Sequence, residues 1–475
     1  QGGHEARAQF WAPPPRAGPA AGAAAGALRR PRLPSMAVSA VGLPFLDRAE
    51  LDDIKKQFPD FRGEVPQEAR FWARDDLEEF FQSKGKKRPQ NEAGSSLIQS
   101  CPLLSRLRLQ LAENKVSKAL TEYTSYCRHL QQQTHFCHLP AAGSCQPVQR
   151  VREAPFPLKE PVTIVPRRDK VAKAEGWSLE FWRANCSDVP WRCQARAPAF
   201  ENDKADPFAM EVNIGEYVEY MQVITNMDAE CSEDNSMAYP RVHIDGWCPF
   251  ATFAFELFES NWKDLNPPGV RDLTPRWCEM YANVIDVGDW KQFLAQFYRI
   301  DIGAIGSFTR LHCEKHGAHL WLTQIEGQRL FFLFPPGDAA NLYEERGGYI
   351  EVVEGYLMDY VTSASPVDPF FPNQKKHTRF AKTAARAALL GQGKTLVVPA
   401  GWWWCSVVTE PSVTLRHAFW GMENRARIVE EWWAPVEGRS HNEREELRQY
   451  FSELREELMQ DDGVSTDKYV VIEGG

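Results

Sequence analysis

Long apolar runs and an excess of positive charge are both absent from this 475-residue chain. No stretch reaches the roughly 18 consecutive apolar residues that a membrane-spanning helix needs, so we expect no membrane span. Lys and Arg number 55 against 64 Asp and Glu, which gives a formal net charge of −9. A chain with this balance is not expected to bind nucleic acid directly through its overall charge.

A regular cysteine framework is absent as well. The eleven cysteines are odd in number and scattered, and no signal-like apolar run precedes them. This usage predicts an intracellular, reducing compartment, either nucleus or cytoplasm. Six residues with metal-binding side chains fall close together without the C-x-x-C pair that zinc sites usually contain: Cys127, His129, His135, Cys137, His138 and Cys145. We favour incidental clustering, and the alternative is a structural zinc held by Cys127, Cys137, His138 and Cys145.

Acidic residues are almost missing from residues 1–35, which contain only Glu5 and are rich in Ala, Pro, Gly and Arg. We interpret this segment as a disordered or untranslated leader, with Met36 as a candidate start. The alternative is an organelle-targeting peptide, because transit peptides are poor in acids and carry Arg. Under either interpretation the segment lies outside the fold.

The remaining chain divides into three regions by its pattern. Residues 36–154 show mostly helical spacing of apolar residues. Residues 155–435 contain short β-branched and aromatic runs bounded by Pro and Gly, and they hold most of the 16 tryptophans. Residues 436–475 are predicted to form a C-terminal helix and a tail.

Short strands recur through the β region. We predict strands over 161–166, 191–195, 297–303 and 308–313, and helices near 177–182, with Ser178 as N-cap, and from 214 to 221. Two hairpins are also predicted: 320–325 with 329–334, and 405–408 with 413–420. Many short strands in an aromatic-rich region are typical of a jelly roll or double-stranded β-helix.

The C-terminal region is predicted to be helical over 425–433, where Pro435 ends the helix, and again over 442–460. The second helix has one apolar stripe, formed by Leu447, Tyr450, Phe451, Leu454 and Leu458. This stripe either packs on its own domain or forms a homodimer with a second copy.

One motif on a predicted strand points to chemistry. His312 and Glu314 are two residues apart, and strand side chains alternate, so both lie on one face. One His and one carboxylate supply two of the three protein ligands that hold non-haem Fe(II) in a facial triad. The third ligand is expected from a distant strand.

Together with this motif, three other segments carry a family resemblance: Trp177–Leu179, Gly327–Arg329 with Leu333–Pro336, and Val398–Trp403. Over about residues 155–435 the chain resembles the JmjC-domain, cupin-like oxygenases, closest to their hydroxylase branch. The resemblance implies a mainly β fold with helical additions, in which a double-stranded β-helix barrel is flanked by a helical N-terminal region and a C-terminal helix. It also implies Fe(II) and 2-oxoglutarate as cofactors and a protein as substrate.

The resemblance also assigns roles to single residues. His312 and Glu314 match the family's metal ligands. Thr309 matches a position whose hydroxyl contacts the 2-oxoglutarate carboxylate. Arg329 falls where many relatives have a Lys that pairs with the far carboxylate of 2-oxoglutarate, and its planar guanidinium suits a carboxylate.

The chain departs from the family at the third ligand. Relatives place a His where this chain has Trp404, and an indole offers only an N–H donor, with no lone pair for a metal. Cys405 is expected to face the opposite side of the strand. His417 should also point away from the pocket, because its neighbour Ala418 matches an inward-facing position. A local rearrangement that brings in His316 or His319 is a further alternative.

Two functions from different classes therefore stay open. The first is an Fe(II)- and 2-oxoglutarate-dependent oxygenase, impaired in activity, that hydroxylates or demethylates a protein side chain. The second is a degenerate JmjC-like domain that acts as a binding or scaffolding module.

Overall fold

The structure of the chain is a computed structural model. The structure describes residues 139, 141–165, 173–194, 209–230, 241–285, 289–314, 317–345, 351–353, 357–359, 363–370, 372–437 and 441–461, together with residues 56, 101, 103 and 104. The predicted leader, most of the helical N-terminal region and the cluster from Cys127 to His138 lie outside these residues. The assignments made there, including the zinc alternative, stay predictions.

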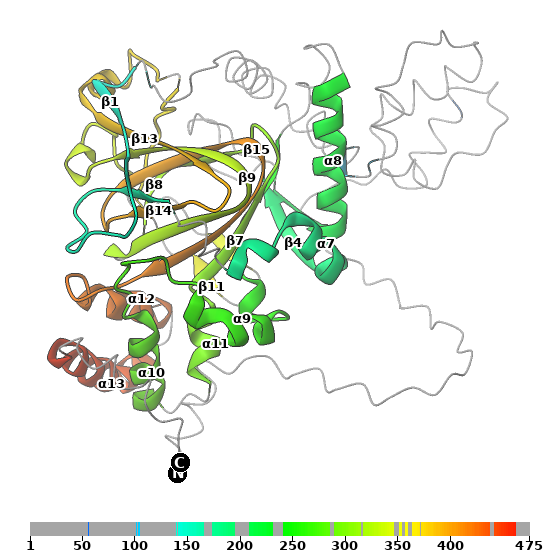
Figure 1. The fold of residues 1–475 in the computed structure, drawn as a ribbon. Helices are drawn as coiled ribbons and strands as arrows, with labels where there is room; N and C mark the ends of the chain where they lie inside the picture. Colours follow the sequence, from blue (N-terminus) through cyan, green and yellow to red (C-terminus); the bar gives the residue numbers. More distant parts are fainter. Residues whose placement is uncertain are drawn as a thin grey trace, which may run out of the picture.

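Two long strands form the centre of a β barrel (Figure 1): β9 (His319–Phe334) and β15 (Trp403–Phe419). They pair antiparallel over almost their whole length, from Trp403 opposite Phe334 to Phe419 opposite His319. Because each of these two strands is at least twice as long as the other strands that pair with it, its two halves belong to two different faces of the barrel.

Four shorter strands complete these two faces. On the first face, β14 (Thr395–Val398) pairs with the first half of β9, and β7 (Tyr298–Gly303) pairs with the second half of β15. On the second face, β13 (Ala384–Gly391) pairs with the second half of β9, and β8 (Phe308–Cys313) pairs with the first half of β15. The arrangement confirms the predicted mainly β, jelly-roll class of fold.

Further strands widen the two faces. Beyond β7 and β14 the first face continues with β6 (His243–Trp247), β4 (Pro190–Gln194), β5 (Ala209–Asn213), β3 (Val162–Ile164) and β2 (Gln149–Val151). The second face adds β1 (Ser144–Pro147) and β12 (Ser363–Ala364), and a separate pair is formed by β10 (Glu351–Val353) and β11 (Leu357–Asp359). Strands β1 and β2 lie before residue 155, so pairing with the barrel starts inside the segment predicted to be helical.

The two predicted hairpins are wrong for one shared reason. The turn-like segments Glu326–Gln328 and Glu410–Pro411 do not reverse the chain, because each lies inside a continuous strand. Register shifts between Val408 and Val413 place the two segments opposite each other, at the corner where both strands pass from one face to the other. Bulges at such corners bend a strand without ending it.

Gly327 is required at this corner. Its φ of +72° lies in the left-handed region, and a Cβ atom there would overlap the carbonyl oxygen of Pro411. We expect Gly327→Ala to lower the free energy of unfolding by about 3 kcal/mol, measured by urea denaturation. Gly391→Ala is the matched control, because the nearest atom to its added methyl group is Lys394 Nζ at 3.8 Å. Equal stability of the two variants would contradict this role of the corner.

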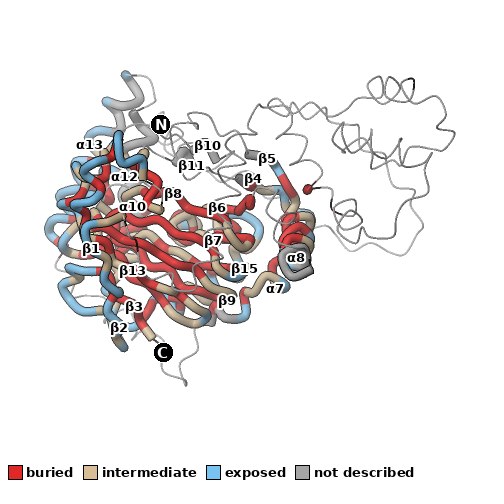
Figure 2. Tube along the Cα trace, turned by 90° about the horizontal axis from the view of Figure 1, so that it is seen from above, coloured by how far each residue is buried: buried red, intermediate tan, exposed pale blue. Residues whose placement is uncertain are grey.

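Helices cover the barrel in two groups, which Figures 1 and 2 show on different sides of it. One group contains α10 (Thr274–Ile285), α12 (Ala426–Glu437) and α13 (His441–Gln460), and the other contains α7 (Leu179–Cys186) and α8 (Ile214–Glu230). The short helix α9 (Phe255–Asn261) lies between α8 and α10 along the chain, and the short helix α11 (Trp290–Ala295) follows α10.

Local signals explain some helix ends and not others. The predicted N-cap is confirmed, because Ser178 Oγ accepts a hydrogen bond from the Phe181 amide at 3.2 Å. The predicted stop at Pro435 is wrong, because α12 continues through it to Glu437.

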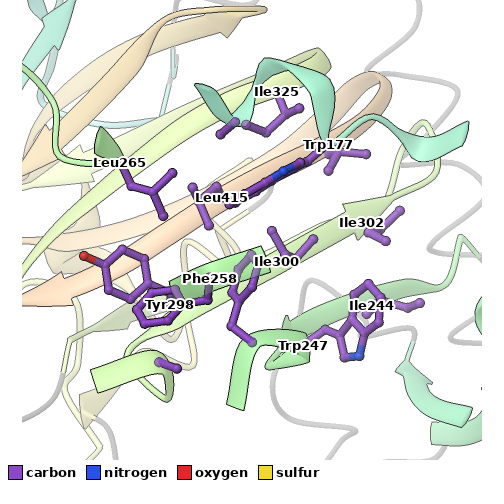
Figure 3. Close-up of a cluster of buried hydrophobic side chains, with 14 of the residues drawn as sticks. Trp177, Ile244, Trp247, Phe258, Leu265, Tyr298, Ile300, Ile302, Ile325 and Leu415 are labelled. Carbon is purple, nitrogen blue, oxygen red and sulfur yellow. The ribbon is translucent and has the colours of Figure 1, made fainter. Parts of the chain in front are cut away.

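The largest core cluster lies between the first face of the barrel and the helices that cover it. Figure 3 shows Trp177, Trp247, Phe258 and Tyr298 gathered with the isoleucines of β6 and β7. Figure 2 shows these central strands buried and the outer surfaces of α12 and α13 exposed. Aromatic side chains bury large areas, which accounts for the tryptophan-rich composition of this region.

The apolar stripe of α13 packs on its own domain. Phe451, Leu454 and Leu458 are buried in the main core, and the Trp277 indole donates to Asp461 Oδ2 at 2.8 Å. This contact surface is therefore occupied within one chain, and the predicted homodimer stays untested.

Among the residues that the structure describes, no helix has the length and apolar character needed to cross a bilayer. The cysteines in the same residues are all free thiols.

Candidate functional site

The predicted donor pair lies at the end of β8. His312 Nδ1 is 2.8 Å from the carbonyl oxygen of Arg310, which can only accept, so Nδ1 carries a proton and the lone pair of the neutral imidazole is on Nε2. Nε2 is 3.7 Å from Glu314 Oε1. Two atoms at this separation can reach one ion through bonds of about 2.1 Å each. The structure therefore brings the two predicted donors close enough to share an ion.

Glu314 is held as a carboxylate. Burial acts to raise its pKa, but the neighbouring His312, Arg416 and Arg299 lower the pKa overall. Its negative charge is thus available to a cation or to the neighbouring guanidinium groups.

Trp404 lies directly opposite His312. The two are paired in register across β8 and β15, and their ring centroids are 4.4 Å apart. The Trp404 side chain is fully buried and packs among apolar side chains inside the barrel: Leu320, Leu322, Phe331, Leu333, Ala388, Leu390, Leu396 and Val398. The indole therefore occupies the position from which the third ligand would come.

A register shift in the same strand pair positions Thr309. Trp404 pairs with His312, and Ser406 pairs with Thr309, with an irregularity between them. Simple alternation would place Thr309 and His312 on opposite faces, because they are three residues apart. The bulge places each of the two side chains on the same face as its partner on β15. Thr309 and His312 therefore both point into the barrel interior.

The residues present do not fit Fe(II) held by three protein ligands. An indole supplies no lone pair, and in the described residues no group of three or more His, Cys, Asp or Glu side chains is arranged to hold a metal ion. Cys405 does not replace the ligand, because it packs with Trp403 in a different core cluster on the other side of β15. The intact donor pair is thus an incomplete site.

Two other candidate histidines that the structure describes, His417 and His319, are engaged elsewhere. The prediction that His417 points away is confirmed, because its Nε2 lies 2.9 Å from Asp272 and its ring stacks on Tyr298 with centroids 3.9 Å apart. His319 accepts a hydrogen bond from the Ala400 amide at 3.0 Å and faces Glu423 at 3.2 Å. His316 lies outside the described residues.

Arg329 is buried and binds the chain's own groups. Its Nε donates to Ser412 Oγ at 3.2 Å, and its Nη1 lies 3.6 Å from Asp301 Oδ2. Neither of these last two atoms makes a hydrogen bond among the described residues, so Asp301 offers Arg329 Nη1 an opposite charge without a hydrogen bond. A cosubstrate carboxylate would have to compete with Asp301 for the charge of this arginine.

Arg329 belongs to a buried charge network that the sequence analysis missed. Arg416 bridges two carboxylates, with Nη2 3.2 Å from Asp245 and Nε 3.4 Å from Asp301. Asp301 Oδ1 also accepts the Gly246 amide at 2.7 Å. A Cβ atom on Gly246, whose φ is +69°, would lie 2.6 Å from Arg416 Nη2, so this glycine makes room for the guanidinium.

A pattern in the sequence could have revealed this network. Polar residues alternate with buried Ile or Leu on three strands, as in Asp245 after Ile244, Asp301 between Ile300 and Ile302, and Arg416 after Leu415. Strand alternation directs all these polar side chains to the face opposite the main core. Burial acts to lower the pKa of Arg416, but Asp301 and Asp245 raise it overall, so the guanidinium stays charged.

The barrel, with its two remaining donors, defines a cupin-like protein. The family model described as "Cupin-like domain" matches residues 169–468, which is more than half of the chain. The chain therefore belongs to the cupin-like family, and the resemblance inferred from its motifs is confirmed. Proteins of this JmjC type typically use Fe(II) and 2-oxoglutarate, and membership supports an oxygenase or a related role.

Curated relatives match only part of this chain. The human protein "HSPB1-associated protein 1" is 31% identical over 102 residues, which cover 22% of this chain and 19% of the relative. The rat protein of that name is 30% identical over the same length. The zebrafish "HSPB1-associated protein 1 homolog" is 30% identical over 132 residues, 27% of each chain. The match thus spans about a fifth of the mammalian relatives' length.

Proposed function

We propose that this chain is a cupin-like protein-binding module whose barrel does not hold iron with the family's three ligands. The observation that carries the proposal is the buried Trp404 side chain, packed against His312 where the third ligand would stand. The ion pair between Arg329 and Asp301 supports it, because it occupies the group expected to bind 2-oxoglutarate.

The relatives support a protein as partner. Their name describes proteins associated with HSPB1, and the identity to this chain reaches 31% over part of its length. A barrel that is rigid and packed inside offers its surface loops for such contacts, since binding residues concentrate on loops held by a scaffold.

Anaerobic titration of the full chain with Fe(II) and 2-oxoglutarate tests the proposal. We expect no metal-to-ligand charge-transfer band in the visible spectrum and no conversion of 2-oxoglutarate to succinate after oxygen is admitted. Appearance of the band together with turnover would overturn the proposed function.

A second candidate, an oxygenase that binds iron through two protein ligands, is favoured by one observation. The proton of His312 is held on Nδ1 by Arg310, which leaves Nε2 directed toward Glu314 as a metal-binding pair requires. The same titration decides between the two candidates.

A further inference from the structure

We propose that the loop from Asn373 to Lys382, which we call the basic loop, docks an acidic segment of a partner protein. This inference deepens the proposed function and rests on it, because it names the chemistry of the partner. The basic loop lies in a stretch with no Asp or Glu from Pro369 to Thr409, although the chain has 64 acids among 475 residues. Local positive charge therefore stands out on an acidic protein.

The loop separates buried from charged residues with a period of three. His377, Phe380 and Thr383 are buried, whereas Lys376, Arg379 and Lys382, each one position earlier, are exposed. Side chains at i and i+3 eclipse in a 3-10 helix, which this segment forms over Thr378–Lys382. Arg379 and Lys382 thus stand on one face, and Lys375 adds a further exposed charge.

The loop is held rigidly, so its charges are presented in a fixed arrangement. Asn373 Oδ1 accepts the amides of Lys375 and Lys376 at 3.1 and 3.2 Å. Phe380 is buried against Phe334, with ring centroids 5.9 Å apart. A preorganised site loses less conformational entropy when it binds a partner.

Tyr343 gives an independent reason to assign a role to this surface. It has a φ of +57°, which a bulky side chain rarely adopts, and in the described residues it is the one non-glycine with positive φ. Its hydroxyl accepts the Arg379 amide at 3.0 Å, and the Arg379 guanidinium lies 4.4 Å from the ring centroid. Strained backbone of this kind concentrates at binding sites, and here it fixes the arginine.

An acidic peptide fits this surface better than other anions. The guanidinium of Arg379 matches a carboxylate, and the lysines add point charges around it. A nucleic acid would extend beyond one loop over a protein whose net charge is −9. Anionic membranes bind surfaces that combine charge with exposed apolar side chains, and the exposed large hydrophobic residues of the described chain, Phe156, Phe253 and Met459, lie outside the loop.

Fluorescence anisotropy with a fluorescein-labelled oligoglutamate peptide tests the proposal on the full chain. We expect saturable binding that weakens as salt rises, and a loss of about tenfold or more in affinity in the triple variant K376E/R379E/K382E. The control triple R183E/R427E/R448E makes the same charge change at exposed arginines already paired with Glu180, Glu430 and Glu445. It should bind almost as well as the parent, and circular dichroism checks that both variants fold.

Three results would overturn the proposal: no peptide binding by the parent, equal losses in both triple variants, or tighter binding to duplex DNA or to phosphatidylserine vesicles than to the peptide. The iron titration is run on the same preparation. Failure of peptide binding with no charge-transfer band rejects the basic loop alone, whereas appearance of the band rejects the proposed function.

Discussion

Trp404→His is expected to create an Fe(II) site that the parent chain lacks. Trp404 and His312 are directly paired across β15 and β8, so a His at 404 places an imidazole beside the existing donors. Nε2 of His312 and the carboxylate of Glu314 are already 3.7 Å apart. The variant would then present two His and one carboxylate, the ligand set that holds non-haem Fe(II).

The expected gain in Fe(II) affinity is measured by anaerobic titration with Fe(II). Calorimetry and tryptophan fluorescence are the two readouts of this titration. Recruiting one more direct ligand should tighten Fe(II) binding by at least about tenfold to a hundredfold, the range that changes to residues supporting a ligand produce. Binding of 2-oxoglutarate is expected to stay weak, because Arg329 remains paired with Asp301.

Trp403→His is the matched control. Trp403 is also buried and is adjacent in sequence, but it packs in the core cluster on the other side of β15. Both variants leave a cavity, which costs about 3–5 kcal/mol when a buried Trp is truncated to Ala and somewhat less for His. A comparable loss of stability in both, with metal binding gained only at 404, isolates the ligand effect. If neither variant, or both, binds Fe(II), the assignment of position 404 fails.

Strand alternation explains which features of the site could be predicted from the sequence. It correctly separated Trp404 from Cys405 and turned His417 away from the pocket, because neighbouring strand residues face opposite sides. It could not give the bulge that turns Thr309 and His312 to the same interior, since that depends on the partner strand. Site geometry was therefore predictable only where the strands are regular.

Turn signals failed at the barrel corner for a related reason. Glu326-Gly327-Gln328 and Glu410-Pro411 have the composition of hairpin turns. Whether such a segment reverses the chain depends on what it pairs with, and here each pairs with the other across two continuing strands. Glycine with positive φ serves both structures, so the local sequence does not distinguish a turn from a corner.

The charge network was missed because its members are far apart in sequence. Asp245, Asp301 and Arg416 come from three strands that the fold brings together, and each residue alone resembles a solvent-exposed position. What the three residues have in common is that strand alternation directs their side chains to the same face of the sheet. Long-range pairing of this kind is the information that a single sequence carries least clearly.

The network also makes Arg416→Met the substitution with the largest expected loss of stability. Methionine fills part of the volume but leaves the buried Asp301 and the half-buried Asp245 without the cation between them. Removing one partner of a buried ion pair costs about 3–5 kcal/mol, because the remaining charge is not solvated. Urea denaturation at neutral pH should show a loss of this size.

The loss should depend on pH in a defined direction. Burial raises the pKa of Asp301, and Arg416 is the strongest influence that lowers it. Without Arg416 the folded-state pKa of Asp301 rises further above its unfolded value, so the folded variant binds a proton that the unfolded chain does not bind. The stabilisation that comes from binding this proton is present at low pH and is lost as the pH rises through the folded-state pKa of Asp301. The stability deficit of the variant should therefore shrink on acidification.

Arg386→Met is the control for this substitution. Arg386 also lies on a barrel strand, but it is partly exposed and lies 3.7 Å from Glu160, whose side chain is 66% exposed. Exposed pairs contribute at most about 1 kcal/mol, so this variant should lose little stability and show little pH dependence. Adding Asp301→Asn to Arg416→Met should recover part of the loss, because it removes one of the two carboxylates that Arg416 neutralises. Strictly additive losses in the double variant would show that the two residues do not interact.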